Sequence, residues 1–182
     1  NYIFFLGNTD PKKNTDRTIL AYANYVKNTN QKNISPLLIA DLKEDFIDKI
    51  LKDNSIEWVK PYIYSSGYIS NSDLPYVYSG AKVFLYTSLR ESFGIPILES
   101  MACGSPIITS NTSAIPEIAG SEAILIDPLN IKEISETLEK LLSDNNYREK
   151  QINYGLERVK LFSWEKTAQE LILLYNKIMQ VN

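Results

Sequence analysis

Hydrophobic and polar positions follow two distinct patterns along the chain. Short, nearly continuous apolar runs predict strands that are buried on both faces of a parallel sheet. These runs cover residues 2–6, 36–40, 83–86, 105–110 and 123–128. A further strand is expected at 56–59 or at 62–64, and the pattern does not decide between the two. Between the runs, apolar residues recur at helical spacing. The chain therefore predicts an α/β fold: a Rossmann-like, doubly wound parallel sheet of about six strands with helices on both faces.

The helices are predicted in the segments that join these strands. Segments 18–26, 42–51 and 131–142 each carry one apolar face, and a short helix is expected to end at Gly80. Asn14 or Thr15 is expected to cap the first helix. A polar helix should run to Lys160, and a final amphipathic helix should follow Ser163-Trp164 and end near Met179.

Composition narrows the function classes. The 182 residues, 44% of them hydrophobic, suit one domain with a well-buried core. A net charge of −3 gives no basic footprint, so nucleic acid is not an expected partner. No apolar run approaches the ~20 residues that span a bilayer, and no signal-peptide pattern occurs at the start. A cytoplasmic domain is the expectation.

Missing residue types exclude several chemistries. Cys103 is the single cysteine and histidine is absent, so the chain can form no internal disulfide, no cysteine metal cluster and no Ser-His or Cys-His pair. Asn1 is not a methionine and is followed at once by a predicted strand. This start predicts a C-terminal domain whose N-terminal partner is absent.

The segment around which the chain is organised runs from the strand at 83–86 through a loop to a helix opened by Pro96 and closed by Gly104. Its loop carries Glu91 and its helix carries Glu99. The helix is expected to pack on the sheet through one set of side chains and to turn Glu99 and Ser100 away from it. The packing set is Ile97, Leu98, Met101 and Ala102. Taken alone, the two glutamates are as well explained by a helix dipole and a solvated loop charge.

The loop after the first strand carries a second candidate group. Gly7 precedes a polar turn with Lys12 and Lys13 at the mouth of a helix. The three-glycine dinucleotide pattern is missing, and two lysines in such a turn can simply be solvated.

The run from Glu91 to Ile108 (ESFGIPILESMACGSPII) resembles the nucleotide-sugar signature of the retaining glycosyltransferases of family 4, which have the two-domain GT-B architecture. The similarity includes both glutamates at the family spacing, the Phe-Gly pair and the Gly-x-Pro turn into the next strand. It extends from about Phe4 to about Tyr175, where Phe162-Ser163-Trp164 matches the turn before the family's last helix. In the family, that helix crosses back to the N-terminal domain.

The resemblance implies donor-binding residues one by one. Lys13 matches the lysine that neutralises the donor diphosphate, and Gly7 precedes it; Asn8 stands where many members have arginine, which leaves open whether Lys12 substitutes. Glu99 should bind the ribose hydroxyls. The backbone of Gly67, Tyr68 and Ile69 should lie against the nucleobase. Glu91, the expected catalytic residue, should contact the transferred sugar together with Phe93, Gly94 and Ile95. Pro116 and Glu117 should border the pocket.

The resemblance also implies a function for residues 1–182 as a single nucleotide-sugar-binding domain, the C-terminal half of a GT-B enzyme. A retaining transfer of sugar from a GDP- or UDP-sugar to a glycan or lipid-linked acceptor is expected, with a mannosyl group favoured and with no metal or other cofactor, since no Asp-x-Asp motif occurs. The acceptor would bind the absent N-terminal domain, and peripheral membrane association is compatible with such an acceptor. The isolated domain is expected to be inactive.

Two other readings stay open. A nonhydrolysing nucleotide-sugar epimerase shares the architecture, although its catalysis uses histidine, which this chain lacks. A catalytically silent nucleotide-binding module is the second. The two glutamates and Lys13 argue against such a loss of activity.

Overall fold

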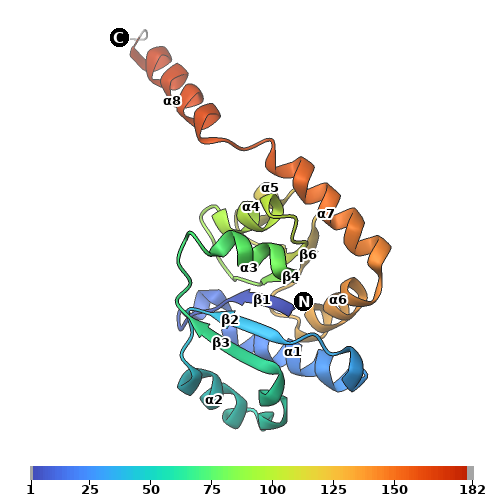
Figure 1. The fold of residues 1–182 in the computed structure, drawn as a ribbon. Helices are drawn as coiled ribbons and strands as arrows, with labels where there is room; N and C mark the ends of the chain where they lie inside the picture. The colour runs from blue at the N-terminus through green and yellow to red at the C-terminus, as the bar shows by residue number, and fades with distance from the viewer. Residues whose placement is uncertain (1, 180–182) are drawn as a thin grey trace.

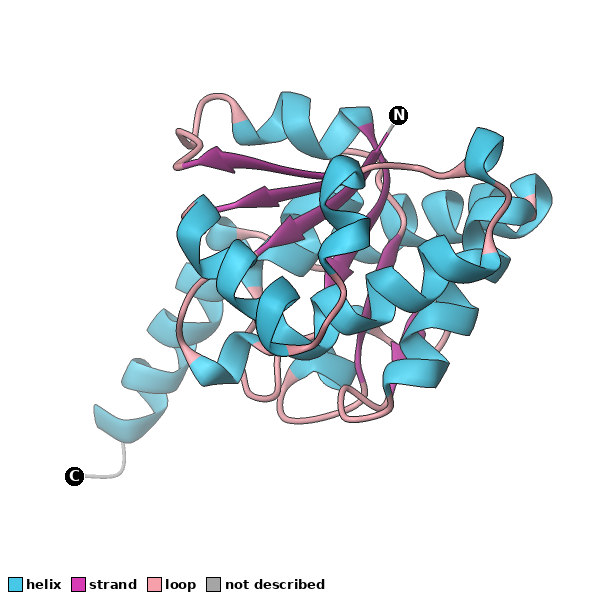
Figure 2. Ribbon diagram, turned by 90° about the horizontal axis from the view of Figure 1, so that it is seen from below, coloured by secondary structure: helices cyan, strands magenta, loops and turns pink. Residues whose placement is uncertain are grey.

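The computed structural model describes residues 2–179, and its centre is a six-stranded sheet. The strand order is β3-β2-β1-β4-β5-β6, and every neighbouring pair is parallel. The strands are β1 (Tyr2–Leu6), β2 (Leu37–Ala40), β3 (Ile63–Gly67), β4 (Ala81–Tyr86), β5 (Ile107–Ser110) and β6 (Ile124–Ile126). The predicted α/β fold with a doubly wound parallel sheet is therefore confirmed, and Figure 2 shows the twisted sheet enclosed by helices.

Helices cover both faces of the sheet (Figure 1). One face carries α1 (Thr15–Asn28), α2 (Glu44–Asp53) and α6 (Ile131–Ser143). The opposite face carries α3 (Leu74–Gly80), α4 (Ile95–Ala102), α5 (Ile115–Ala119) and α7 (Asn145–Val159). Side chains of β1 alternate between the two layers, because Ile3 and Phe5 join the core under α1 while Phe4 joins the core under α4. Both layers bury strand residues completely, which explains the continuous apolar runs of the sequence.

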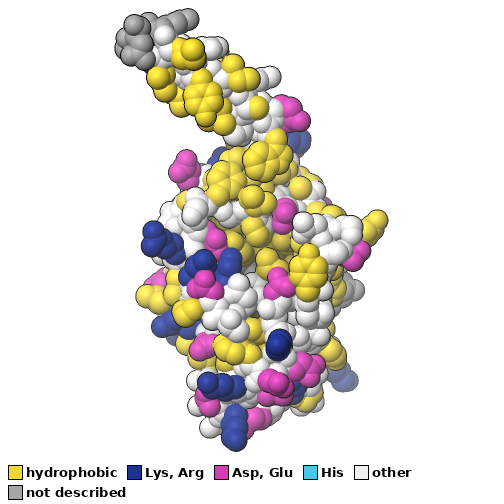
Figure 3. Space-filling view, turned by 90° about the vertical axis from the view of Figure 1, so that its left-hand side faces the viewer, with side chains coloured by type: hydrophobic (Ala, Val, Ile, Leu, Met, Phe, Trp, Pro, Cys, Tyr) yellow, Lys and Arg dark blue, Asp and Glu magenta, His cyan; other side chains and the backbone are white. Residues whose placement is uncertain are grey.

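The last helix, α8 (Trp164–Met179), projects away from this body and buries none of its residues (Figure 1). Figure 3 shows hydrophobic side chains along it, open to solvent. The large exposed ones are Trp164, Leu171, Ile172, Leu173, Leu174, Tyr175, Ile178 and Met179. The predicted amphipathic helix is thus present, but its apolar side chains contact no core within residues 2–179. None of the helices in that range is both long enough and apolar enough to cross a bilayer.

Element boundaries correct the sequence prediction in three places. The third strand begins at Ile63, and the segment before it, predicted as an alternative strand, forms the 3-10 helix η3 (Glu57–Tyr62). Pro61 in this segment has no N–H to donate to a strand ladder. The helix expected from Leu42 begins at Glu44, although Leu42 is buried. The final strand is shorter than predicted and spans only Ile124–Ile126.

The packing face of α4 also differs from the prediction. Ile97 and Met101 are buried as expected, whereas Ala102 is exposed and Leu98 is half-buried. Ser100, predicted to turn away from the sheet, is fully buried and donates a hydrogen bond to the carbonyl of Ser105. The helix has only eight residues, so a small rotation about its axis changes which positions face the sheet.

Candidate functional site

The site lies where the winding of the sheet reverses. The crossover from β1 runs through α1 on one face, and the crossover from neighbouring β4 runs through α4 on the other face. In open α/β sheets, ligands bind beyond the carboxyl ends of the strands at this switch point. The loops after β1 and β4 carry the predicted groups Lys13 and Glu91. The fold therefore brings together residues that are 78 positions apart in the chain.

Lys13 and Glu91 form an ion pair across this switch point. The Lys13 Nζ donates to Glu91 Oε1 at 2.7 Å, and the side chains are only 17% and 15% exposed. The same ammonium lies 5.3 Å from the ring centroid of Tyr86, the last residue of β4. A half-buried ammonium held against an aromatic ring and a carboxylate is fixed in position better than a solvated lysine.

The surroundings of Glu91 keep it ionised. Burial alone raises the pKa of a carboxyl group, but hydrogen bonding from Lys13 and from the hydroxyls of Tyr86 and Ser88 outweighs it, so the pKa of Glu91 lies below its ordinary value. Burial and the nearby charge of Glu91 raise the pKa of Tyr86, which remains a neutral donor. The charge of Glu99 also raises the pKa of Tyr86. Tyr86 therefore lies within electrostatic range of both predicted glutamates.

Backbone contacts hold the loop of Glu91 from two sides. The N–H of Leu89 donates to the carbonyl of Lys12 at 2.7 Å, which ties this loop to the 3-10 helix η1 (Pro11–Lys13). On the other side, the Ser113 hydroxyl accepts from the N–H of Glu91 and donates to its carbonyl. The Thr112 hydroxyl donates to the carbonyl of Leu89. The carboxylate of Glu91 is thus presented by a pre-organised loop rather than by a mobile one.

Asn14 occupies the N-cap position of α1 but does not cap it through its side chain. Its amide instead donates to the carbonyls of Thr87 and Pro128, at 3.1 and 2.7 Å, and the side chain is buried. The backbone of Asn14 is left-handed, with a φ of 60°. Asn14 therefore links the turn after β1 to the segments that follow β4 and β6.

Glu99 lies on α4 and is half-buried. Its Oε2 accepts a hydrogen bond of 3.1 Å from the hydroxyl of Tyr78, which comes from the end of α3. Tyr78 is only 1% exposed, and burial together with the charge of Glu99 raises its pKa. The contact holds the carboxylate beside α3.

The predicted nucleobase contact lies at the end of β3, the edge strand of the sheet. Gly67 has a φ of 65° and open space around its α-carbon, so the chain turns sharply there. Tyr68 is 76% exposed and Ile69 is half-buried against the core under α3. Gly7 is buried instead: an added β-carbon would lie 3.0 Å from Ile39 and Phe5. Gly7 therefore lets the β1 turn pack closely.

Phe93, Gly94 and Ile95 form the corner between the loop and α4. Gly94, with a φ of 98°, is the N-cap, and Phe93 and Ile95 are about half exposed. The helix start offers fewer donors than the sequence suggested, because Pro96 has no N–H and Ile97 donates to Gly94. The ring of Phe93 packs edge-on against the ring of Phe162, with 6.2 Å between the ring centroids. The turn before α8 therefore contacts this corner.

Lys12 is peripheral to the ion pair. Its ammonium is exposed and lies 3.1 Å from the carboxylate of Asp10, which is also exposed. Glu117 is exposed on α5, and its carbonyl accepts from Arg158. No cluster of three or more acidic, cysteine or histidine side chains suited to a metal occurs within residues 2–179.

The carboxyl edge of the sheet is open and has mixed charge (Figure 3). Two hollows lie on its α2 side, of about 200 and 600 Å³, and Thr9 and Phe46 line both. Neither is lined by Lys13, Glu91 or Glu99. The side chains of Lys13 and Glu91 are only 17% and 15% exposed, and Glu99 is half-buried. Ligand sites commonly lie at domain interfaces.

Sequence reasoning missed the residues that orient the candidate groups: Tyr78, Tyr86, Asn14 and Ser113. Tyr78 and Tyr86 occupy apolar runs, where an aromatic residue is expected to be core. Ser113 lies in a polar turn with no distinctive pattern. A buried tyrosine needs a partner for its hydroxyl, and this requirement was the one signal in the sequence that pointed beyond packing.

Comparison with known proteins places these residues in a family. Residues 1–158 match the family model described as "Glycosyl transferases group 1". The chain is 33% identical over 178 residues to the O-antigen chain mannosyltransferase B of Escherichia coli, a match that covers 96% of this chain and 45% of that protein. The chain thus spans less than half the length of this curated relative.

Two solved structures show the same fold. Sucrose-phosphate synthase from Thermosynechococcus elongatus superimposes with a TM-score of 0.82 at 23% identity, over all of this chain and 46% of that one. The C-terminal domain of a group 1 glycosyl transferase (LpcC) from Francisella tularensis superimposes with a TM-score of 0.74 at 25% identity, over 88% of this chain and 85% of that one.

Proposed function

Since the chain belongs to the group 1 glycosyl transferases, we propose that it is the donor-binding domain of a two-domain glycosyltransferase of the GT-B architecture. In this proposal, residues 1–182 form the C-terminal half, and the acceptor binds a domain that precedes it. The apolar side chains of α8 are exposed in the part of the chain that the structure describes. In this proposal they would pack against that preceding domain. The enzyme transfers the sugar of a nucleoside diphosphate sugar to a glycan or lipid-linked acceptor, releasing the nucleoside diphosphate, at or near a membrane surface on the cytoplasmic side.

The observation that carries the proposal is the pairing of Lys13 with Glu91 at the switch point of the sheet. A nucleoside diphosphate needs a cation for its phosphates, a carboxylate for its ribose and polar groups for its sugar. Lys13 supplies the cation, Glu99 the ribose carboxylate and Glu91 the group beside the sugar. The proposal is supported by the contact of Lys13 with Glu91, which joins the loops after β1 and β4, and by the position of Glu99 on α4, the helix that follows the second loop.

Donor binding would rearrange the ion pair. The diphosphate competes with Glu91 for the ammonium of Lys13, and Glu91 is then free to orient a sugar hydroxyl. In the chain without donor, the pKa of Glu91 lies below its ordinary value, so the group that the diphosphate releases is a carboxylate anion. An anion beside the anomeric carbon stabilises the positive charge that develops as the diphosphate leaves. Loss of the diphosphate and attack by the acceptor on the same face would retain the anomeric configuration.

The mannosyltransferase relative supports mannose as the transferred sugar. GDP is proposed as its carrier, with UDP as the alternative. No residue of the chain is assigned to a metal, and the proposed transfer needs none. The epimerase alternative is not favoured, because the family match is to glycosyl transferases and the chain contains no histidine.

Calorimetric titration of the chain with GDP, UDP and ADP tests the proposal. At least one nucleotide should bind weakly, and binding should be preferential for one base. The chain alone should transfer no sugar from a GDP- or UDP-sugar, since the acceptor site is on the other domain. Undetectable heats with all the nucleotides at millimolar concentration, or equal binding of unrelated anions such as sulfate, would count decisively against donor binding.

A further inference from the structure

The carboxylate of Glu99 has an unusual partner for a surface glutamate. Its Oε2 accepts from the hydroxyl of Tyr78 at 3.1 Å, and Tyr78 is almost completely buried. A buried hydroxyl that loses its hydrogen-bond partner carries a desolvation cost. The position of Glu99 that accepts the hydrogen bond from the Tyr78 hydroxyl is therefore strongly favoured. The burial and the nearby charge of Glu99 that raise the pKa of Tyr78 keep this hydroxyl protonated as a donor.

The ring of Tyr78 is itself held rigidly. It packs edge-on against Phe4 at 5.4 Å between ring centroids and against Phe84 at 5.1 Å. Phe4 and Phe84 belong to β1 and β4, the central strands that flank the switch point, and both are fully buried. The hydroxyl position is therefore set by the centre of the sheet, and the side-chain entropy that Glu99 would lose on binding a ligand is already lost.

We propose that Tyr78 is a positioning residue for the donor: its hydroxyl holds Oε2 of Glu99 so that Oε1 accepts from the ribose diol. This inference rests on the proposed donor-binding function. Tyr78 belongs to α3, the helix that follows the proposed nucleobase contact at Gly67, Tyr68 and Ile69. It thereby links the element expected at the base to the carboxylate expected at the ribose, and ribose recognition depends on how α3 packs on α4.

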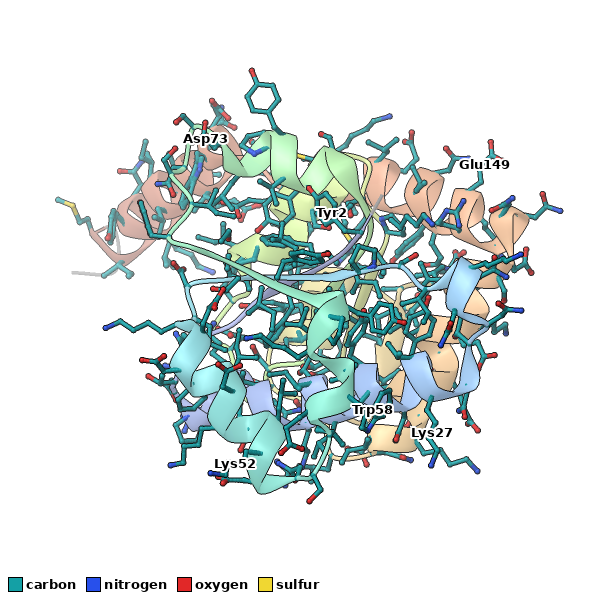
Figure 4. All side chains as sticks on the ribbon, turned by 60° about the horizontal axis from the view of Figure 1, so that its bottom comes forward. Tyr2, Lys27, Lys52, Trp58, Asp73 and Glu149 are labelled. Carbon is teal, nitrogen blue, oxygen red and sulfur yellow. The ribbon has the colours of Figure 1, made fainter. Side chains whose placement is uncertain are left out.

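The test compares Tyr78→Phe with a matched control in the same core. Tyr2→Phe also removes a tyrosine hydroxyl that bonds α3, since Tyr2 donates to the carbonyl of Val77 at 2.7 Å. Figure 4 shows Tyr2 among the packed side chains beneath α3. Each variant of the chain is titrated with GDP and 2′-deoxy-GDP, and with UDP and 2′-deoxy-UDP. Circular dichroism melting of each variant verifies the fold.

Tyr78→Phe should weaken ribonucleotide binding by about fivefold, the effect of one ordinary hydrogen bond, and should weaken deoxynucleotide binding less. The preference for ribose over deoxyribose therefore shrinks in Tyr78→Phe and stays unchanged in Tyr2→Phe. In a Glu99→Ala background, Tyr78→Phe should have no further effect. Equal losses for ribose and deoxyribose, or an unchanged preference, would overturn the positioning role while leaving donor binding intact.

Glu99→Asp tests the same geometry without a change in the core. The shorter side chain cannot reach both the Tyr78 hydroxyl and a ribose, so this variant should lose as much of the ribose preference as Glu99→Ala. Full preference in Glu99→Asp contradicts the inference even if Tyr78→Phe fails to fold. Failure of the unaltered chain to bind either nucleotide is a different result: it overturns the proposed donor-binding function, and the role of Tyr78 with it.

Discussion

The two glutamates of the central segment lie eight positions apart, yet the structure places them in opposite electrostatic settings. Glu91 is paired with the ammonium of Lys13, whereas Glu99 is bound by the neutral hydroxyl of Tyr78. The charges of Lys13 and Glu91 nearly cancel. The hydroxyl of Tyr78 carries no charge, so the pair of Tyr78 and Glu99 is not neutralised. A ligand that brings its own phosphates must break the first pair but can add its hydroxyls to the second without breaking anything.

This difference assigns different work to the two carboxylates. The ion pair can be exchanged when a diphosphate arrives, because Lys13 gains a new anion and Glu91 gains sugar hydroxyls. The hydrogen bond from Tyr78 can persist, because a carboxylate accepts several hydrogen bonds at once. Glu91 is therefore suited to a role in which its partner changes when the donor binds. Glu99 is suited to binding the nucleotide while keeping its hydrogen bond to Tyr78.

The largest effect should follow removal of the cation. Lys13→Met should weaken nucleoside diphosphate binding by roughly tenfold to a hundredfold, since a charge-assisted hydrogen bond contributes about 1.5–3 kcal/mol. Lys12→Met is the matched control, because Lys12 is exposed and beside Asp10. It should cost no more than a few-fold. Calorimetry with GDP and UDP measures the affinity of both variants. Equal losses of affinity for the two lysines would mean that the diphosphate binds at the exposed turn and not at Lys13.

Substitutions of Glu99 and of Glu91 should have different effects on nucleotide binding and on turnover. Glu99→Ala should weaken nucleotide binding by about tenfold through the loss of ribose hydrogen bonds. Glu91→Gln should leave binding of the nucleoside diphosphate unchanged or tighten it slightly, because it removes the competitor for Lys13. In the full two-domain enzyme, the order should reverse for turnover, which Glu91→Gln lowers more. A larger loss of nucleotide affinity in Glu91→Gln than in Glu99→Ala would break the assignment.

A smaller effect is expected on stability as the pH changes. The pKa of Glu91 is lower in the folded chain than its ordinary value of 4.5, so the ion pair stabilises the fold fully above that pH. The stabilisation is lost as the pH falls through the lower, folded value. Its size should be about 1 kcal/mol, given partial exposure to solvent. Urea unfolding of the unaltered chain and of Glu91→Gln should differ by a constant amount from pH 7 to 5 and converge below.

Convergence that begins near pH 6 would mean that the pKa of Glu91 is raised rather than lowered.

The smallest effect should come from α8. A chain that ends after Ser163 retains Phe162 against Phe93 and loses only a helix that buries no residue. Its melting temperature and its nucleotide affinity should match those of the complete chain within error. A large drop in the melting temperature would show that α8 contributes to the core of this domain.

Much of this arrangement was predictable because it follows from pattern and topology. Continuous apolar runs at β1 and β4 predict buried parallel strands, and parallel strands bring their following loops to one edge. The meeting of Lys13 and Glu91 at that edge also depends on the strand order, which places β1 beside β4 and which the pattern did not predict. The family resemblance added the roles that we propose for the two residues.

Other features depend on packing that no local pattern encodes. Tyr78 reaches Glu99 only because α3 and α4 pack side by side at one register. The sequence pattern around a buried tyrosine is the same whether or not its hydroxyl contacts a site residue. The face of α4 was mispredicted for a similar reason, since Ser100 is buried by a hydrogen bond to Ser105 rather than by hydrophobicity. The third strand was ambiguous because η3 and β3 are both short and mixed in polarity.

The most direct test of the central claim is a map of backbone amide shifts by NMR as GDP or UDP is added to the chain. Shifts should concentrate at 7–13, 67–69 and 91–99, which follow the carboxyl ends of β1, β3 and β4, and Lys13→Met should reduce them at the same nucleotide concentration. Shifts confined to α2 and the turn before it, or spread over α6 and α7, would contradict a nucleotide site at the switch point.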